Sequence, residues 1–410
     1  MLVFIPISWV LNFALPKSYS NKDTLVFVFS FLAIVPLAKL LAFATDELSK
    51  RVGQTLAGLI NATLGNAVEL IVAIIALVKC QIPLVQASLI GSILSNLLLV
   101  LGMCFFAGGL KFSEQGFGVS ITQLNSSLLT LSVIAVLLPA AFHLFVTTND
   151  STESNEILKV SRGVAIVLLF IYGSYLVFQL YSHTVLYDDK HEGIFRSTKY
   201  DLKKKKSSDK CKSETALTES SNDHSNEDPE QGNVAANEEE PEEEVPELNL
   251  FMALFLLAVV TVFVAVTAEW LVDSIGGLTA NGQISETFVG IILLPIVGNA
   301  AEHATAVTVS VKDKLNLSLG VAVGSSIQIS LFVIPFTVIL GWILGKPMSF
   351  LFDPYESVVL FLSVLTVNYV VQDGKSNWLE GMILMCLYVI LAITFWFYPG
   401  ATSSPGAPSC

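Results

Sequence analysis

The chain contains Gly65-Asn66-Ala67-Val68-Glu69 and, 233 residues later, Gly298-Asn299-Ala300-Ala301-Glu302. Each copy places one carboxylate in an otherwise apolar stretch. A second signature starts 26 residues after each first glycine, namely Gly91-Ser92-Ile93-Leu94-Ser95 and Gly324-Ser325-Ser326-Ile327-Gln328. A charged group within hydrocarbon is costly and usually marks an ion or proton site. One such group in corresponding places of two repeats indicates a transporter whose site lies between the halves.

Apolar segments long enough to cross a bilayer make up most of the chain. The 410 residues are 53% hydrophobic and only 14% charged, whereas soluble domains carry about 25% charged residues. About 20 consecutive apolar residues span a bilayer. We predict ten full spans, at 24–45, 55–79, 83–108, 120–146, 158–182, 248–275, 286–312, 315–345, 354–373 and 376–398.

A shorter apolar run, Leu2 to Leu15, precedes these spans. It lacks the basic start and the clear cleavage site of a signal peptide, so we interpret it as a short first span. The predicted fold class is therefore an all-α polytopic membrane protein with about eleven transmembrane helices.

A polar stretch divides the ten full spans into two sets of five. Residues 183–247 hold 18 acidic and 9 basic residues and so contribute −9 of the net charge of −13. Because this stretch has little apolar content, we expect a largely disordered, acidic cytosolic linker, which is either a solubilising connection or a regulatory arm. An odd number of crossings per set starts the second set from the opposite side of the membrane, as in inverted repeats. The predicted organisation is a first helix at 1–16, five-helix repeats at 17–182 and 248–398, and a tail at 399–410.

The motifs carry pairs of polar side chains three residues apart, which places each pair on one helix face. The pairs are Asn66 with Glu69, Asn299 with Glu302, Ser92 with Ser95, and Ser325 with Gln328. If the four segments face each other, they supply carboxylate, amide and hydroxyl oxygens, and calcium prefers six to eight oxygen ligands. The sequence has no cluster of His and Cys that would suggest zinc or copper. We therefore predict a Ca²⁺ and proton site centred on Glu69 and Glu302, and we expect no cofactor.

Glycine and proline residues are expected to break both motif helices. Gly58 and Gly65 lie in the first motif span, and Pro295 and Gly298 lie in the second. Broken helices at membrane depth persist only where the freed backbone groups line a cavity or a bound ion. These breaks strengthen the prediction of an ion site.

Two glutamates in one apolar pocket favour exchange of a cation for protons. Ionised carboxylates there repel each other and are poorly solvated, so at least one should hold a proton near neutral pH when no cation is bound. A divalent cation neutralises the pair, and so do two protons. Binding of the cation and of the protons should therefore be mutually exclusive.

A second group of residues is predicted to serve as a proton relay or cation access route. It consists of Glu47, Glu269, His303 and Ser95. The alternative for the glutamates is that they are span-end charges reaching the interface, and for His303 it is hydrogen-bonded packing. By contrast, Asn377 and Glu380 have the spacing of a capping box, and we predict a structural role for them.

At these motifs the chain resembles the calcium/proton exchangers of the CAX family, within the cation/calcium exchanger superfamily. Gly-Asn-Ala-Val-Glu, Gly-Asn-Ala-Ala-Glu-His and the two Gly-Ser signatures carry a resemblance that covers nearly all of the chain outside the linker and the ends. It looks most like the fungal vacuolar exchangers. The resemblance implies one leading helix plus two inverted five-helix repeats, in the membrane of a vacuole or other acidic organelle. It also implies that Glu69 and Glu302 carry the transported ion or its protons, helped by Asn66, Ser92, Asn299, Ser325 and Gln328.

Three other classes of function are alternatives. A sodium/calcium exchanger would be expected to carry a further acidic residue near each motif glutamate, whereas Leu70 and Ile71 follow Glu69, and His303 follows Glu302. A cation channel needs a continuous pore lined by rings of groups, usually from several subunits. A membrane enzyme is disfavoured because no His-Glu-x-x-His, Gly-x-Ser-x-Gly or phosphate-binding loop occurs. The expected partners are Ca²⁺, H⁺ and the membrane, with no nucleic acid, and the oligomeric state is left open.

Overall fold

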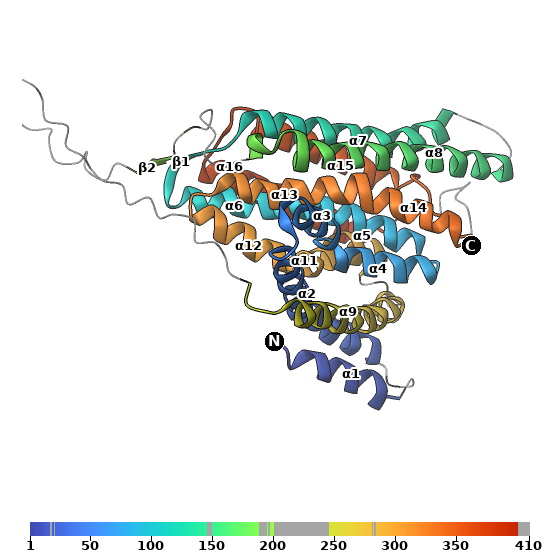
Figure 1. Ribbon diagram of the computed structural model, residues 1–410. Coiled ribbons are helices and arrows are strands. Elements are labelled where there is room, and N and C mark those ends of the chain that lie inside the picture. The colour runs from blue at the N-terminus through green and yellow to red at the C-terminus, as the bar shows by residue number, and fades with distance from the viewer. Residues whose placement is uncertain are drawn as a thin grey trace, which may run out of the picture. The chain divides into compact units, whose positions relative to one another are not determined.

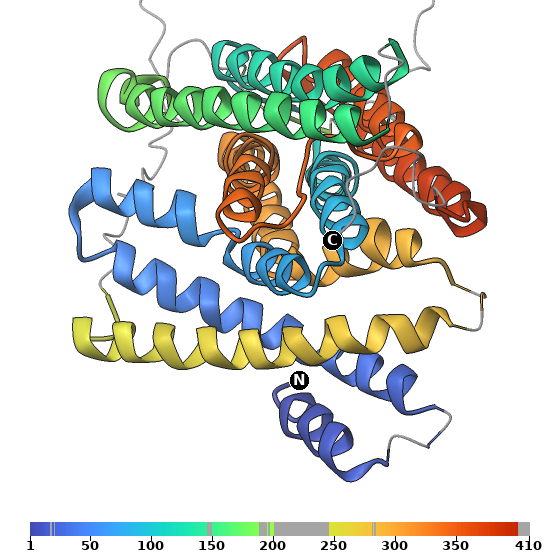
Figure 2. The ribbon, with the colours of Figure 1, turned by 90° about the vertical axis from the view of Figure 1, so that its right-hand side faces the viewer.

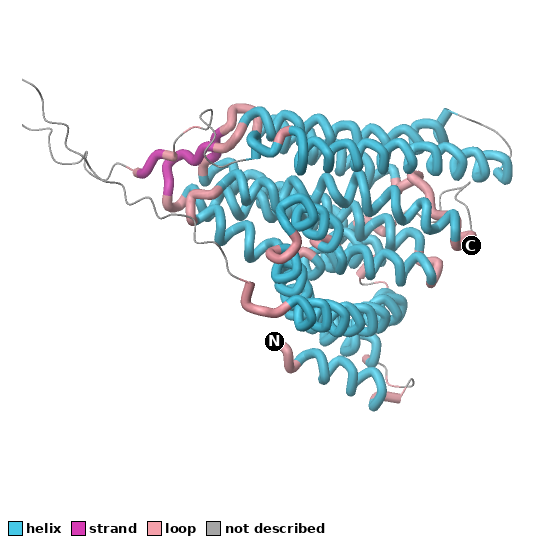
Figure 3. The backbone as a smooth tube through the Cα atoms, viewed as in Figure 1, coloured by secondary structure: helices cyan, strands magenta, loops and turns pink. Residues whose placement is uncertain are grey.

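A computed structural model of the chain describes residues 1–16, 19, 21–145, 150–187, 195, 197–200, 246–280, 282 and 284–400. Helices dominate these residues (Figure 3). Most of the predicted linker, 201–245, and most of the predicted tail, 401–410, lie outside the described residues.

The helices follow the predicted spans in order. Those of the first half are α1 (Phe4–Ala14), α2 (Lys22–Ser49), α3 (Gly53–Leu64), α4 (Ala67–Val78), α5 (Ile82–Leu94), η1 (Ser95–Val100), α6 (Leu101–Gly109), α7 (Val119–Phe145), α8 (Asp150–Val177), η2 (Phe178–Ser182) and η3 (Thr184–Tyr187). Those of the second half are α9 (Leu250–Thr279), α10 (Glu286–Phe288), η4 (Val289–Leu293), α11 (Leu294–Gly298), α12 (Ala300–Val311), α13 (Leu315–Gln328), η5 (Ile329–Val333), α14 (Ile334–Ile343), α15 (Pro354–Val370) and α16 (Trp378–Phe397). The segments η1, η2, η4 and η5 are π-helical, and η3 is a 3₁₀ turn.

Seven of these helical segments are long and apolar enough to cross a membrane, or eight if the bent pair α10–α11 and α12 counts as one span, within the described residues. The other predicted spans correspond to shorter helices. They are α1 with 11 residues, α15 with 17, and the pair α3 and α4 with 12 residues each. The prediction of a helical, polytopic membrane protein is therefore confirmed at this coarser level.

The helices that carry the motifs lie in the middle of the bundle. Figures 1 and 2 show α7, α8, α15 and α16 on one side and α1, α2 and α9 on the other, with α4–α6 and α10–α14 between them. Within one 18-residue apolar window of each span, 83% of the residues are buried in Ile82–Gly109 and 22% in Asn155–Ser182. The span that contains α5 and α6 is therefore packed on nearly all faces, and the outer helices expose apolar side chains as membrane-facing helices do.

Both motif helices are broken, as the sequence predicted. In the first half the break falls at Gly65–Asn66, between α3 and α4. In the second half it falls at Asn299, where the helix axis bends by 56°. The prediction for Gly58 was wrong, since α3 continues through this residue. One glycine loosens a helix by only about 1 kcal/mol relative to alanine, so Gly58 alone does not end it.

The two halves touch most closely where α5 crosses η4. A Cβ atom at Gly91 would overlap the backbone of Ile291. Gly290, in turn, lies against Ala87 of α5, where an added Cβ would come within 2.7 Å of the alanine Cβ. Small residues thus allow the backbones of the two halves to approach each other.

Three short strands depart from the prediction of an all-α chain. They are β1 (Phe112–Gly116), β2 (Thr198–Lys199) and β3 (Lys375–Ser376), in the antiparallel order β2-β1-β3. They gather at one end of the helices (Figures 1 and 3). Two residues are enough for β2 and β3, so no periodic pattern in the sequence marks them.

Candidate ion-binding site

Glu69 and Glu302 lie in matching places, each in the first turn of the half-helix that follows a break. Glu69 is 9% exposed, and the two carboxyl groups are close enough to interact electrostatically. Among the described residues, Glu69 Oε1 and Glu302 Oε2 are buried without a hydrogen-bond partner. The amino ends of α4 and α12 carry positive partial charge. The site thus joins two acceptors whose buried oxygens have capacity for a cation or a proton.

Asn66 links the helix break between α3 and α4 to the second half of the chain. It occupies the N-cap position of α4, but its side chain makes no capping bond. Instead its Nδ2 donates to Gln328 Oε1 at 2.7 Å, and its Oδ1 accepts from Ser325 Oγ at 2.8 Å. Asparagine is a favoured N-cap residue, yet the side chain of Asn66 bonds to α13 and not to its own helix. It therefore links the two halves of the chain.

Asn299 shows the corresponding behaviour in the second half. It is the N-cap residue of α12 and also makes no capping bond. Its Nδ2 donates to the carbonyl oxygen of Ser92 at 3.5 Å. Each motif asparagine therefore reaches the serine of the other half's Gly-Ser signature, and the predicted meeting of the four segments is observed.

Gly298 and a narrow cavity border Glu69. A Cβ atom at Gly298 would lie 2.7 Å from Glu69 Oε1, so the glycine leaves room for the carboxylate. The cavity is lined by residues of α2, α4, α5, α9 and α11: Ile34, Val68, Glu69, Val72, Ser88, Leu89, Ser92, Leu271, Leu294, Pro295, Val297 and Gly298. Its wall is mainly apolar, so Glu69 is largely shielded from bulk water on this side.

His303 and Ser95 also meet. The Ser95 Oγ and His303 Nε2 atoms are 3.3 Å apart, which joins the start of η1 to α12 next to Glu302. The structure thus brings two of the predicted relay residues to the edge of the site.

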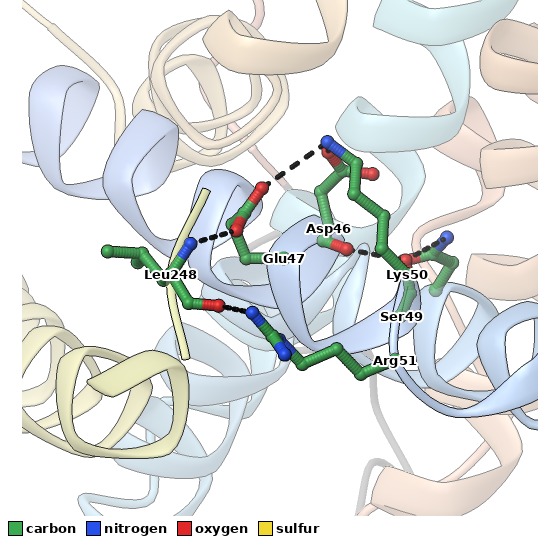
Figure 4. Close-up of polar contacts among 7 residues, drawn as sticks. Asp46, Glu47, Ser49, Lys50, Arg51 and Leu248 are labelled. Atoms are coloured by element: carbon green, nitrogen blue, oxygen red, sulfur yellow. Dashed lines mark hydrogen bonds and ion pairs between the residues drawn. The ribbon is translucent and has the colours of Figure 1, made fainter. Parts of the chain in front are cut away.

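The contacts of Glu47 lie at the end of α2, away from the motif glutamates. It is fully buried near the end of α2, and its Oε2 accepts from the backbone N–H of Leu248 at 2.8 Å. Its Oε1 pairs with Lys50 Nζ at 3.3 Å, and Arg51 donates to the Leu248 carbonyl (Figure 4). These contacts tie the beginning of the second half to the end of α2.

Glu269 lies on the surface of α9 and pairs with the end of α4. Its side chain is 54% exposed and lies 3.6 Å from Lys79 Nζ, which also pairs with Asp273. The contacts of Glu47 and Glu269 thus lie away from the Glu69–Glu302 pair. The pseudo-equivalence of these two residues in sequence does not extend to their surroundings.

Comparison with known proteins gives the family. A family model described as sodium/calcium exchanger protein matches residues 22–181 and 252–397. The chain belongs to this sodium/calcium exchanger protein family. The resemblance to cation/calcium exchangers, predicted from the two motifs, is confirmed.

Relatives and solved structures of the exchanger family match almost the whole chain. It is 50% identical to a vacuolar calcium ion transporter of Cryptococcus neoformans var. grubii, over 98% of this chain and 74% of that protein. It is 42% identical to a vacuolar calcium ion transporter of Schizosaccharomyces pombe, over 97% of this chain and 84% of the relative. A crystal structure of the Ca²⁺/H⁺ antiporter protein YfkE is similar with a TM-score of 0.70 and 29% identity, over 97% of both chains.

One polar residue of the exchanger's central network was missed by the sequence analysis. Asn96 is fully buried, and its Nδ2 donates to Ser325 Oγ at 3.0 Å. Its Oδ1 is buried and has no hydrogen-bond partner in the part of the chain that the structure describes. Comparison of the two repeats did not reveal Asn96, because the equivalent position in the second half is Ile329. Its place directly after the Gly-Ser signature was the available signal.

The π-helical turns were also not predicted. η1 begins at Ser95, the last residue of the first Gly-Ser signature, and η5 begins at Ile329, directly after the second. A π turn changes which side chains face a neighbouring helix, and such turns are frequent at functional sites. In this exchanger η1 contains the polar residue Asn96, and η5 directly follows the polar residue Gln328.

Proposed function

We propose that this protein is a secondary active antiporter that exchanges Ca²⁺ for H⁺ by alternating access and removes calcium from the cytosol. The observation that carries this proposal is the pair of glutamates, one from each half, that lie in matching first turns and interact electrostatically, each with a buried carboxylate oxygen. The vacuolar calcium transporters of C. neoformans and S. pombe support a vacuolar or other acidic-organelle membrane as its location.

The mechanism follows from the electrostatics of the pair. Two carboxylates in a low-dielectric site are stable together only when their charge is compensated. One Ca²⁺ compensates both, and two protons do the same, so each species displaces the other. In the proposed site Glu69 and Glu302 hold the ion or the protons, while Asn66, Asn299, Ser92, Ser325 and Gln328 supply or orient further oxygens.

The proposed site changes its exposure from one side of the membrane to the other in its neutral state. An empty site with two ionised carboxylates would bear a large desolvation penalty inside the membrane. Reorientation is therefore favoured only after Ca²⁺ or protons have bound, which couples the two fluxes without any cofactor. In this scheme His303 and Ser95 pass protons at the edge of the site.

The proposed architecture has eleven spans. A leading helix at 1–16 precedes two inverted five-helix repeats at 17–182 and 248–398, separated by an acidic cytosolic linker at 183–247 and followed by a tail at 399–410. The breaks at Gly65–Asn66 and at Asn299 support this repeat relation because they recur at equivalent positions, and the π turns η1 and η5 follow at nearly equivalent ones.

A sodium/calcium exchanger is the second candidate, favoured by the description of the family model. Among the described residues, no group of three or more His, Cys, Asp or Glu side chains is placed to hold a metal ion. A cation at the site would therefore meet two carboxylates and otherwise neutral oxygens. Two acidic groups suffice for one Ca²⁺ or two protons, and this favours protons as the counter-ion.

The decisive experiment measures uptake of labelled Ca²⁺ into proteoliposomes. An inside-acid pH gradient should drive uptake, and a matched outward Na⁺ gradient at equal pH should not. Na⁺-driven uptake would instead establish the second candidate. Uptake that follows the Ca²⁺ gradient alone, with no effect of either counter-ion, would indicate a channel and overturn both.

We predict that Glu69→Gln and Glu302→Gln each abolish proton-driven uptake. Loss of one buried charged partner typically costs about 3–5 kcal/mol, which corresponds to a fall of about 100-fold or more. The matched control is Glu380→Gln, because Glu380 also lies in a first helical turn but belongs to the capping box of α16. The control should transport like the parent. Parent-like uptake by either site variant would remove that residue from the proposed site.

A further inference from the structure

The amino end of α15 carries a second pair of carboxylates. Asp353 is the N-cap residue of α15, and Glu356 lies three residues later in its first turn. Asn377 and Glu380 have the same places at the start of α16, where the two side chains form a capping box. The spacing therefore predicts that Glu356 also reaches back to the backbone of the residue that caps its helix.

Only half of this box forms in α15. Asp353 Oδ1 accepts from the N–H groups of Tyr355 at 2.8 Å and of Glu356 at 3.4 Å. The Glu356 side chain makes no bond to the Asp353 N–H in return, and this residue is only 3% exposed. A buried carboxylate without a hydrogen bond is costly, so helix capping does not account for Glu356.

The carboxyl group of Glu356 has no compensating partner within the described part of the chain. No hydrogen bond and no ion pair reaches its oxygens there, and the charge that acts on it is the like charge of Asp353. The two carboxyl groups thus interact without sharing a hydrogen bond. Two oxygens that bind one Ca²⁺, each at about 2.3–2.6 Å, lie up to about 5 Å apart, so such a separation suits an ion between them.

Tyr398 brings the far end of α16 to the same place. Its hydroxyl lies 2.9 Å from Asp353 Oδ2 and 3.0 Å from Oδ1, to which it donates, and it is within electrostatic range of Glu356. Asp353 and Tyr398 are partly exposed, whereas Glu356 is buried. Solvent therefore reaches the pair at Asp353 and Tyr398.

The pair is separate from the Glu69–Glu302 site. α15 leads from Pro354 towards β3, so its amino end lies at the end of the helices away from the three strands (Figure 1). β2 belongs to the proposed cytosolic linker, and the opposite end of the helices then faces the lumen. This orientation rests on the proposed function, in which Ca²⁺ is delivered to the lumen.

We propose that Asp353 and Glu356 form a second binding site for a divalent cation, with Ca²⁺ as its ligand at the lumenal end of the helices. One such ion balances both carboxylates, and the Tyr398 hydroxyl oxygen and water extend the oxygen shell that Ca²⁺ prefers. Two carboxylates make a weak site, with a Kd of about 10⁻⁴–10⁻³ M. Bound Ca²⁺ would tie the start of α15 to the end of α16.

The test uses Tb³⁺, which binds oxygen ligands as Ca²⁺ does and luminesces when a nearby tyrosine such as Tyr398 is excited. The full chain with Glu69→Gln and Glu302→Gln lacks the proposed transport site and is the reference protein. It should give saturable luminescence that Ca²⁺ displaces. Adding Glu356→Gln should lower the apparent affinity for Tb³⁺ by about tenfold or more. Adding Glu380→Gln, at the matching place in α16, should leave it unchanged.

A second variant keeps the test valid if Glu356→Gln does not fold. Asp353→Asn removes the other carboxylate but retains a favoured N-cap residue, so it should fold and bind Tb³⁺ equally poorly. Thermal unfolding in detergent without added ions checks that each variant is folded. Ca²⁺ should raise the unfolding temperature of the reference protein, and both variants should lose this rise.

Two results would refute the second site. One is a Tb³⁺ affinity in folded Glu356→Gln or Asp353→Asn equal to that of the reference protein. The other is a reference protein without saturable, Ca²⁺-sensitive luminescence, which would mean that a proton alone neutralises Glu356. Binding does not require transport, so a chain that failed to exchange Ca²⁺ for protons would overturn the proposed function and leave this readout intact.

Discussion

At the scale of single residues, three asparagines show how one local pattern serves two purposes. Asn66, Asn299 and Asn377 each precede a helix and have glutamate three residues later. Asn377 forms the capping box with Glu380, as the spacing predicted. Asn66 and Asn299 leave their helix ends uncapped and bond across to the other half. Since an unmade cap costs about 1 kcal/mol, the cross-links between halves take precedence over local stability.

Gly298 offers a test of how tightly the Glu69 carboxylate is held. Gly298→Ala would put a methyl group 2.7 Å from Glu69 Oε1 and so force the side chain to move. We expect the apparent affinity for Ca²⁺ to fall by about tenfold, or 1.4 kcal/mol, with normal protein levels. The KM of Ca²⁺ uptake measures this. Gly173→Ala, where the added group meets nothing within 4 Å, is the control, and an unchanged KM in Gly298→Ala would show that the position of this oxygen is not critical.

The residues of the candidate site could be chosen from the sequence because the chain repeats itself. Glu69 and Glu302 stand out as charges in apolar helices, and the 233-residue offset selects their polar neighbours. Asn96 was not predictable in this way, since Ile329 replaces it in the second copy. A repeat reveals what both halves share, whereas a side chain present in only one half is found by its three-dimensional neighbours.

At the scale of elements, helix order and the two breaks could be read from the sequence, whereas their fine geometry could not. Apolar length sets the spans, and Gly-Asn at each motif marks the break. The π turns η1 and η5 have no compositional mark, because a π turn changes the hydrogen-bond register of a helix without a special residue. The pairing of β1 with β3 joins Gln115 to Ser376, and such distant contacts arise from the packing of whole helices.

The end of α2 provides a test between two roles of Glu47. If it anchors Leu248, Glu47→Gln should transport almost normally, because an amide oxygen still accepts the Leu248 N–H bond. Glu47→Ala should lose that bond and leave Lys50 with fewer partners, so it should unfold at lower temperature. A buried hydrogen bond is worth about 0.5–1.5 kcal/mol. Thermal unfolding in detergent and uptake in proteoliposomes are measured on both variants.

The opposite pattern would revive the predicted access role of Glu47. Glu47→Gln with normal thermal stability and abolished uptake would mean that its charge, and not its hydrogen bond, matters. Glu269→Gln serves as the comparison, since Glu269 is exposed and paired with Lys79. It should be silent in both assays.

At the scale of the whole molecule, the two halves meet through the polar network and the close approach of α5 to η4. Both are made only when the halves are together: Asn66 needs Ser325, and Asn299 needs Ser92. Neither half holds a complete site. The proposed site requires only that both halves lie in the same membrane. The segment between the halves contributes no residue to it and can therefore be polar.

The last prediction concerns that connecting segment. Replacing Tyr200–Val245, a separate unit of the chain, with a Gly/Ser chain of equal length should preserve Ca²⁺/H⁺ exchange, because the described contacts of Leu248 with Glu47 and Arg51 are kept. Exchange rates at low and high Ca²⁺ are compared in proteoliposomes.

A second variant changes only the glutamates of 238–244 to glutamine and so separates the effect of charge from the effect of length. If both variants alter the rate alike, the acidic run regulates the exchanger electrostatically, whereas a parent-like rate in both makes the segment a solubilising connection. Complete loss of exchange in a replacement protein that reaches the membrane in normal amounts would instead make the segment part of the transport machinery, contrary to the proposed division of the chain.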